Sequence, residues 1–197
     1  MKRAFDFTVA LAGVVMTSPV MLVAGGLVKL DSKGPALYRA TRIGRHGRPF
    51  QMYKLRTMHV NADREGAAVT HAGDPRVTRV GRVLRRFKID ELPQLLNVVR
   101  GDMSLVGPRP EAPEFVERYT ADQRRVLSVR PGITGPAALA FIDEERTLAQ
   151  GDPQSIYLAS VMPAKLDIDL EYVQHRSFAG DLRVLAATLR RVFAPRR

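Results

Sequence analysis

The first thirty residues carry the feature that most constrains this chain. Residues 7–28 contain no charged side chain, and as a straight helix this run is long enough to cross the hydrocarbon core of a bilayer. Ser18-Pro19 lies at its middle. Because proline lacks a backbone N–H and its ring clashes with the preceding turn, we expect the helix to bend or break there. Basic residues flank both ends: Lys2, Arg3, Lys29, Lys33, Arg39, Arg42, Arg45 and Arg48.

Three interpretations of the apolar run compete. A signal peptide is disfavoured, because cleavage near Ala24-Gly25-Gly26 would leave a cationic, disulfide-free domain outside the cell. A spanning anchor is the ordinary interpretation of the length. A re-entrant helix-break-helix, with its membrane break at Ser18 and Pro19, also explains why both flanks are basic, since basic flanks favour the cytoplasmic side. The residues alone leave the last two interpretations open.

The composition narrows the class of protein. A chain of 197 residues suits one compact domain with a small appendage. The absence of cysteine excludes disulfides, cysteine-ligated zinc and thiol nucleophiles, and the four histidines show no metal-ligand spacing. A formal charge of +11 predicts polyanionic partners: nucleic acid, an anionic lipid surface or a phosphorylated substrate. The apolar run argues against a nucleic-acid module.

The coarse pattern predicts a small β-hairpin followed by helices. Short strands over 35–39 and 49–55 flank the turn-forming residues 44–47. From Lys29 to Arg56 there are eight Lys or Arg against one acid, a net charge of +7, which suits anionic headgroups or a lipid phosphate; for the outer residues of this run, membrane topology alone is an equal explanation.

Helices are expected further along, where apolar residues recur at helical spacing. Their ranges are 76–86, 90–99, 111–126, 164–174 and 181–193. Residues 130–135 are interpreted as a turn because they are rich in glycine. The last helix is basic and amphipathic, so it either lies on an anionic membrane or packs on the domain core.

Two adjacent acids, Asp90 and Glu91, are the strongest candidates for chemistry. They follow a basic stripe and precede Pro108-Arg109-Pro110. The stripe recurs every third residue: Arg76, Arg79, Arg82 and Arg85. Carboxylates beside cations suit phosphate chemistry, as metal ligands or as a nucleophile. The alternative is structural, because an acid at a helix start also caps free backbone amides.

Several long motifs then occur together in one order. They are Lys2-Arg3-x-x-Asp6 before the apolar run with Ser18-Pro19, SKGPALYRATRIGRHGRPFQMYKLRTM at 32–58, DPRVTRVGRVLRRFKIDELPQLLNVVRGDMSLVGPRPE at 74–111, and RPGITG at 130–135. With these motifs the chain resembles the bacterial sugar transferase family, the monotopic phosphoglycosyl transferases that load a sugar phosphate onto a polyprenyl phosphate.

The resemblance implies a reaction and a set of site residues. A sugar phosphate would pass from a UDP-sugar to undecaprenyl phosphate with release of UMP, in a Mg²⁺-dependent reaction that begins glycoconjugate or exopolysaccharide assembly. Asp90 would be the nucleophile of a covalent aspartyl intermediate, Glu91 a base or metal ligand, and both acids would hold Mg²⁺. The expected substrate-binding residues are Lys54, Arg56, Arg85, Pro108, Arg109, Pro110 and Arg130.

The expected architecture is an α+β, mostly helical fold. Residues 1–30 form the re-entrant membrane hairpin, and residues 31–197 form a small cytoplasmic catalytic domain with a short β-hairpin and interfacial amphipathic helices. The domain is expected on the cytoplasmic face of the bacterial inner membrane, bound to anionic lipids and not to nucleic acid, with a homodimer left open.

The sequence departs from many relatives after residue 135. Where those continue with a tryptophan and an Asn-Gly-Arg segment, this chain reads Pro-Ala-Ala-Leu-Ala-Phe over 136–141, which leaves the sugar undetermined. Two rival functions remain: a membrane-bound nucleotide-sugar hydrolase that uses the same acids, and a non-enzymatic polybasic membrane adaptor.

Overall fold

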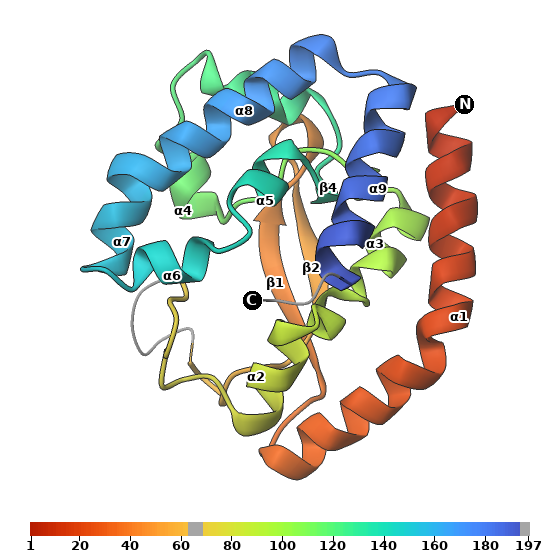
Figure 1. Ribbon diagram of the computed structural model, residues 1–197, viewed down its shortest axis with the longest axis vertical. Helices are drawn as coiled ribbons and strands as arrows, with labels where there is room; N and C mark the ends of the chain where they lie inside the picture. Colours follow the sequence, from red (N-terminus) through yellow and green to blue (C-terminus); the bar gives the residue numbers. More distant parts are fainter. Residues whose placement is uncertain (63–68, 194–197) are drawn as a thin grey trace.

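The computed structural model describes residues 1–62 and 69–193, and its longest element is the N-terminal helix α1 (Lys2–Asp31). Figure 1 shows α1 along one side of the molecule, with a bend partway along its length. The expected helix-break-helix is corrected, because α1 remains helical through Pro19. Proline leaves the carbonyl of Val15 without its usual partner, and the Ser18 hydroxyl donates to that oxygen at 2.8 Å.

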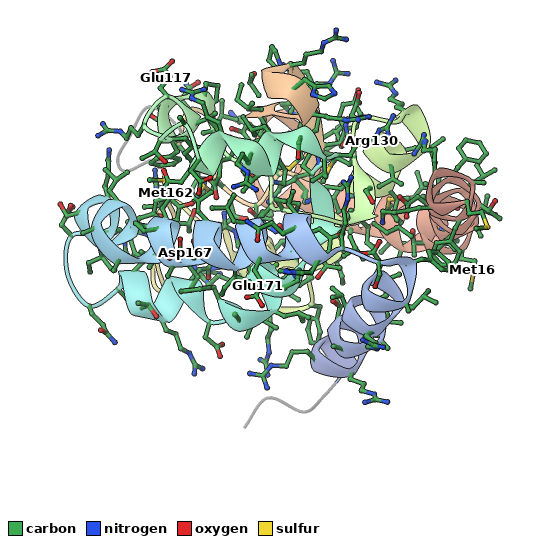
Figure 2. All side chains as sticks on the ribbon, turned by 90° about the horizontal axis from the view of Figure 1, so that it is seen from above. Met16, Glu117, Arg130, Met162, Asp167 and Glu171 are labelled. Atoms are coloured by element: carbon green, nitrogen blue, oxygen red, sulfur yellow. The ribbon has the colours of Figure 1, made fainter. Side chains whose placement is uncertain are left out.

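Much of α1 is exposed and apolar. Among the described residues, α1 is the helix that is long and apolar enough to cross a membrane, judged by length and composition only. Figure 2 shows Met16 projecting from α1 away from the rest of the molecule. The buried residues of α1 are Asp6, Ala10, Ala24 and Val28. Whether the helix re-enters one leaflet stays a prediction.

The predicted β-hairpin is present. Strand β1 (Leu37–Ile43) pairs antiparallel with β2 (Pro49–Leu55), in a register that runs from Leu37 opposite Leu55 to Ile43 opposite Pro49. Between them, the turn passes through Gly47 at a φ of 74°, which glycine adopts without strain. The first strand extends further than expected, to Ile43.

A second, parallel pair joins β3 (Ser104–Val106) and β4 (Gly132–Thr134). The expectation that residues 130–135 form only a turn is therefore wrong. Glycine permits the strand here because the two backbones approach closely: a Cβ on Gly132 would lie 2.2 Å from the Gly107 nitrogen.

The predicted helix over 90–99 begins later than expected. Helix α2 (Arg79–Arg86) is capped by Thr78, whose hydroxyl accepts from the Gly81 amide at 3.0 Å. A single 3-10 turn, η2 (Ile89–Glu91), follows, and then helix α3 (Gln94–Arg100). Asp90 thus lies in a turn before the helix, and Pro93 occupies the N-cap of α3.

The expected helix over 111–126 is also wrong, since the structure has a short α4 (Pro113–Val116) and a separate 3-10 helix η3 (Gln123–Ser128). A new helical segment begins after Thr120. The Thr120 amide donates to Gln123 Oε1 at 2.9 Å, and the Thr120 hydroxyl accepts from the Gln123 amide at 3.2 Å. This reciprocal pairing is a capping arrangement that begins a new helix.

The remaining helices form the C-terminal part of the chain. They are α5 (Pro136–Ala140), α6 (Glu144–Leu148), α7 (Pro153–Ile156), the π-helical turn η4 (Tyr157–Val161), α8 (Met162–His175) and α9 (Phe178–Phe193). Figure 1 shows α8 across one end of the molecule and α9 beside the N-terminal end of α1. The predicted helices over 164–174 and 181–193 lie within α8 and α9 and are confirmed.

Candidate active site

The candidate site forms where the β-hairpin, the η2 turn and the loop after β3 meet. Lys54 near the end of β2 donates to Glu91 Oε1 at 3.3 Å, and Arg109 Nη2 donates to the same oxygen at 2.7 Å. Three residues that are far apart in the sequence thus form one ion-paired group, with Asp90 next to it in η2.

Asp90 is only 6% exposed, and among the described residues its Oδ1 has no hydrogen-bond partner. Burial raises the pKa of Asp90, and the charge of Glu91 adds to this effect. The positive charges of Lys54, Arg85 and Lys88 act in the opposite direction. A buried carboxylate oxygen without a partner is costly to the fold, so it is an oxygen available to bind or attack a ligand.

Glu91 behaves differently from its neighbour. Burial acts to raise the pKa of Glu91, but the charges of Arg109 and Lys54 hold it well below its usual range. The Glu91 carboxylate in turn raises the pKa of the Arg109 guanidinium. At neutral pH, Glu91 is therefore a fixed negative charge that orients two cations beside Asp90.

Helix α3 fixes the position of the β1–β2 hairpin relative to the η2 turn. Asn97, which is fully buried, accepts from the Tyr53 amide at 3.0 Å and donates to the Gln51 carbonyl at 2.7 Å. Tyr53 directly precedes Lys54, so the contact links the cation on β2 to the helix that follows η2. The sequence reasoning missed Asn97, although an amide within the apolar stretch 95–99 was a usable signal.

The loop that carries Arg109 is anchored by the parallel strand pair. The Gly132 amide donates to the Pro108 carbonyl at 2.9 Å, and the Gly107 amide donates to the Thr134 carbonyl at 2.9 Å. Since Pro108 and Pro110 restrict the backbone on either side, the guanidinium loses little freedom when it binds an anion.

Arg85 lies at the edge of this group. Its Nε donates to the Thr57 hydroxyl at 2.9 Å and its Nη1 pairs with Glu145 at 3.2 Å, while its charge acts on Asp90. The predicted stripe of arginines is shorter than expected: α2 begins at Arg79, and Arg76 lies before it, paired with Asp74 at 2.6 Å.

Two predicted substrate-binding residues have framework contacts. Arg56 is buried and donates to the Pro35 carbonyl at 2.7 Å and to the hydroxyl and carbonyl of Ser32 at 2.7 and 2.9 Å, which holds the link between α1 and β1. Arg130 Nε donates to the Gly101 carbonyl at 2.7 Å. The structure does not group either residue with Asp90 and Glu91, and their role in binding stays a prediction.

A polar cluster surrounds Glu111, two residues after Arg109, and the sequence reasoning missed it. Tyr157 donates to Glu111 Oε1 at 2.6 Å, and Lys165 pairs with Glu144 at 2.9 Å and with Glu111 at 3.6 Å. Asp169 is 4% exposed, and its Oδ1 has no hydrogen-bond partner within the described part of the chain. Burial raises the pKa of Asp169 to about 7, against the lowering effect of Lys165.

The described residues contain no group of three or more His, Asp or Glu side chains suited to a metal ion. Mg²⁺ does not require one, because it often binds one or two protein carboxylates and completes its shell with substrate phosphates and water. The unpartnered Oδ1 of Asp90 and the adjacent Glu91 carboxylate therefore fit Mg²⁺ in the presence of a diphosphate.

The chain is similar to known proteins over nearly its whole length. The family model described as bacterial sugar transferase matches residues 1–195. A UDP-glucose:undecaprenyl-phosphate glucose-1-phosphate transferase of Caulobacter vibrioides is 42% identical over 199 residues, covering 95% of this chain and 68% of the relative.

Other relatives differ in length and in the sugar that they are named for. A UDP-N-acetylgalactosamine-undecaprenyl-phosphate N-acetylgalactosaminephosphotransferase of Aeromonas hydrophila is 37% identical over 97% of this chain and 43% of its own length. An uncharacterized sugar transferase of Bacillus subtilis is 38% identical over 98% of this chain and 87% of its own length. The chain thus spans less than half of the Aeromonas hydrophila protein.

Proposed function

This chain belongs to the bacterial sugar transferase family, and on that premise we propose that it transfers a sugar phosphate from a UDP-sugar to undecaprenyl phosphate and releases UMP. Relatives named for this reaction support the proposal. The observation that carries it is the buried Oδ1 of Asp90, without a hydrogen-bond partner among the described residues, next to a Glu91 that is paired with Lys54 and Arg109.

The proposed reaction has two displacements at one phosphorus atom. First, an Asp90 carboxylate oxygen bonds to the β-phosphorus of the UDP-sugar, the bond from that phosphorus to the bridging oxygen breaks, and UMP leaves. Second, a phosphate oxygen of undecaprenyl phosphate attacks the same phosphorus, and the Asp90 carboxylate leaves unchanged. A carboxylate nucleophile is suited to this sequence because it is also a good leaving group.

The surrounding residues reduce the repulsion between a carboxylate and a diphosphate. Lys54 and Arg109 are held beside Asp90 by Glu91 and would bind phosphate oxygens of the donor. Mg²⁺, held by the Asp90 and Glu91 carboxylates, would neutralise charge on the diphosphate. Of the two roles expected for Glu91, its lowered pKa favours the metal ligand over a base that accepts a proton from the lipid phosphate.

The membrane placement of the proposal rests on how α1 packs. Near its start, Ala10 lies in one core cluster with Met52 and Val98, and near its end Val28 lies in another with Leu55. Both ends of the apolar helix thus contact the same domain, which supports a re-entrant insertion with the active site on the cytoplasmic face of the inner membrane.

The experiment combines a nucleophile variant with a half-reaction. Asp90→Asn keeps the side-chain shape and removes the nucleophile, so UMP release with undecaprenyl phosphate and a panel of UDP-sugars should fall by several orders of magnitude. The control Asp122→Asn, at an exposed ion pair, should keep wild-type turnover. Retention of about a tenth of wild-type turnover in Asp90→Asn, a loss of only ~1.4 kcal/mol, contradicts the assigned role.

The half-reaction separates the rival functions. With UDP-sugar and Mg²⁺ but no lipid, the transferase should release at most one equivalent of UMP and gain one phosphosugar in intact mass, on the peptide that contains Asp90. A hydrolase would release UMP continuously without lipid. A membrane adaptor would release none under any condition.

A further inference from the structure

The N-terminal end of α1 has a group of buried charges that the proposed chemistry does not use. Lys2 Nζ lies 2.7 Å from Asp181 Oδ2 on α9 and 3.6 Å from Asp6 Oδ2. Asp6 and Asp181 are only 3% and 4% exposed. The Ser104 hydroxyl, at the start of β3, donates to Asp6 Oδ2 at 2.8 Å. Because removing one partner strands a buried charge, such a group holds its elements in one arrangement.

The C-terminal helices are tied into the same group. The Tyr172 hydroxyl on α8 contacts Asp181 Oδ1 at 2.7 Å and the Val106 carbonyl of β3 at 3.3 Å. Phe5 and Phe178 pack edge to face with ring centroids 5.2 Å apart. Figure 1 shows this end of α1 beside α9. The membrane helix is therefore fixed to α8, α9 and β3 at its first turns.

Arg3 extends this connection to the catalytic turn. Its Nη1 donates to the Val98 carbonyl at 2.6 Å and its Nη2 to the Val99 carbonyl at 3.0 Å, in the last turn of α3. The Gly101 amide also donates to the Val98 carbonyl at 3.1 Å, and the guanidinium adds a second donor there and a donor to Val99 at the end of α3. Ten residues further on, α1 fits closely against α3, since a Cβ on Gly13 would lie 3.1 Å from Leu95 Cδ1.

These contacts connect the membrane helix to both sides of the active site. Helix α3 directly follows the turn that bears Asp90 and Glu91, and its Asn97 binds the β2 backbone beside Lys54. A change in the angle between α1 and α3 therefore moves the whole site relative to the bilayer in which α1 would lie.

We propose that Lys2, Arg3 and Asp6 are positioning residues that set the depth and orientation of the catalytic turn toward a membrane-bound acceptor phosphate. This inference rests on the proposed function. The physical reason is an asymmetry between the two substrates: a nucleotide donor diffuses to the site from water, whereas the bilayer holds the phosphate of a long-chain lipid at one depth. A displacement of about 1 Å costs up to ~100-fold in rate when a reactant cannot follow the site.

The test uses Asp181→Asn in the full-length protein. This variant removes the charge that faces Lys2, keeps an oxygen for Tyr172 and leaves the basic N-terminus intact. Three rates are measured: transfer to undecaprenyl phosphate in phospholipid vesicles, transfer to a short-chain polyprenyl phosphate in detergent, and acceptor-free UMP release. The vesicle rate should fall by about tenfold, while the other two stay within about twofold of wild type. Asp167→Asn, on the exposed side of α8 (Figure 2), is the matched control.

A second variant keeps the inference open to contradiction if Asp181→Asn does not fold. Lys2→Met should give the same selective loss, and Lys2→Arg should restore the vesicle rate, because arginine retains the charge that pairs with Asp181. An equal fall of all three rates means that the contacts serve only the fold, and no fall in vesicles means that they position nothing; either result overturns the inference. If the wild-type protein releases no UMP in any of the three measurements, the proposed function itself is wrong, and the inference that rests on it fails as well.

Discussion

At the scale of single residues, two adjacent acids differ because of their neighbours. Asp90 is buried with an unpartnered oxygen, which raises its pKa, while Glu91 is held by Arg109 and Lys54, which lower its pKa despite its burial. Titratable neighbours whose pKa values are pushed apart can take different roles in one reaction. Glu91 holds the cations Lys54 and Arg109, and under the proposed function Asp90 is the group that reacts.

Asp169 gives a pH-dependent prediction at this scale. Its pKa is about 7 in the folded protein because of burial, and about 3.9 in an unfolded chain. The folded state therefore holds one more proton between these values, so this group makes the free energy of unfolding decrease as pH rises from about 4 to about 7.

Asp169→Asn removes this titration. Thermal unfolding in detergent should show the variant more stable than wild type at pH 8, and the difference should shrink toward pH 4, where the unfolded wild-type chain begins to bind the same proton. A difference in melting temperature that is the same at both pH values contradicts the shifted pKa.

At the scale of elements, close backbone contacts decide which residues are tolerated. Helix α2 lies against Thr57, just after the end of β2. A Cβ on Gly81 would lie only 2.1 Å from the Thr57 carbonyl oxygen. Thr57 also accepts a hydrogen bond from Arg85. The approach of α2 to the end of β2 therefore places Arg85 near Asp90, and it requires glycine at position 81.

Gly81→Ala should destabilise the protein although alanine favours helices by about 1 kcal/mol, because backbone cannot move aside as a flexible side chain can. Gly26→Ala in α1 is the matched control, since, apart from the neighbouring backbone of its own helix, no atom of the described residues lies within 4 Å of its added Cβ. Thermal unfolding of both variants checks this. A Gly81→Ala protein as stable as wild type would show that α2 does not pack as described.

At the scale of the whole molecule, one helix forms both the membrane element and part of the catalytic framework. Ala10 packs near α3 and Val28 packs near α2, so α1 contacts the domain at both ends. Pro19 lies within this bent helix, and the Ser18 hydroxyl satisfies the carbonyl that Pro19 leaves free. Under the proposed re-entrant insertion, this packing at both ends of α1 would keep the domain beside the membrane surface.

The topology prediction uses the absence of cysteine from this chain. If α1 is re-entrant, both of its basic flanks lie inside, so exposed Ala4→Cys and Lys33→Cys should both resist an impermeant thiol reagent applied to spheroplasts. In the double variant Ser18→Ala and Pro19→Ala, a regular helix can span, and part of the Ala4→Cys population should become labelled. Labelling of Ala4→Cys with native Ser18-Pro19 in place would identify a spanning anchor.

Features that depend on neighbours along the chain could be predicted from the sequence. Turn residues between two short strands predicted the β-hairpin, helical spacing predicted α8 and α9, and the long uncharged run predicted an apolar helix. Several motifs in one order indicated the family, which the match over residues 1–195 confirms. These properties survive folding because they are set by local backbone preference and side-chain periodicity.

Contacts between groups that are distant in the sequence became visible in the folded chain. Lys54 and Arg109 contact Glu91, whereas Arg56, equally basic and close in sequence to Lys54, binds Ser32 and Pro35. Which partner a charged side chain binds depends on how strands and helices far apart in sequence are placed, and residue type does not encode this. The parallel pairing of β3 with β4 depends in the same way on a close backbone approach, which no periodicity in the sequence reports.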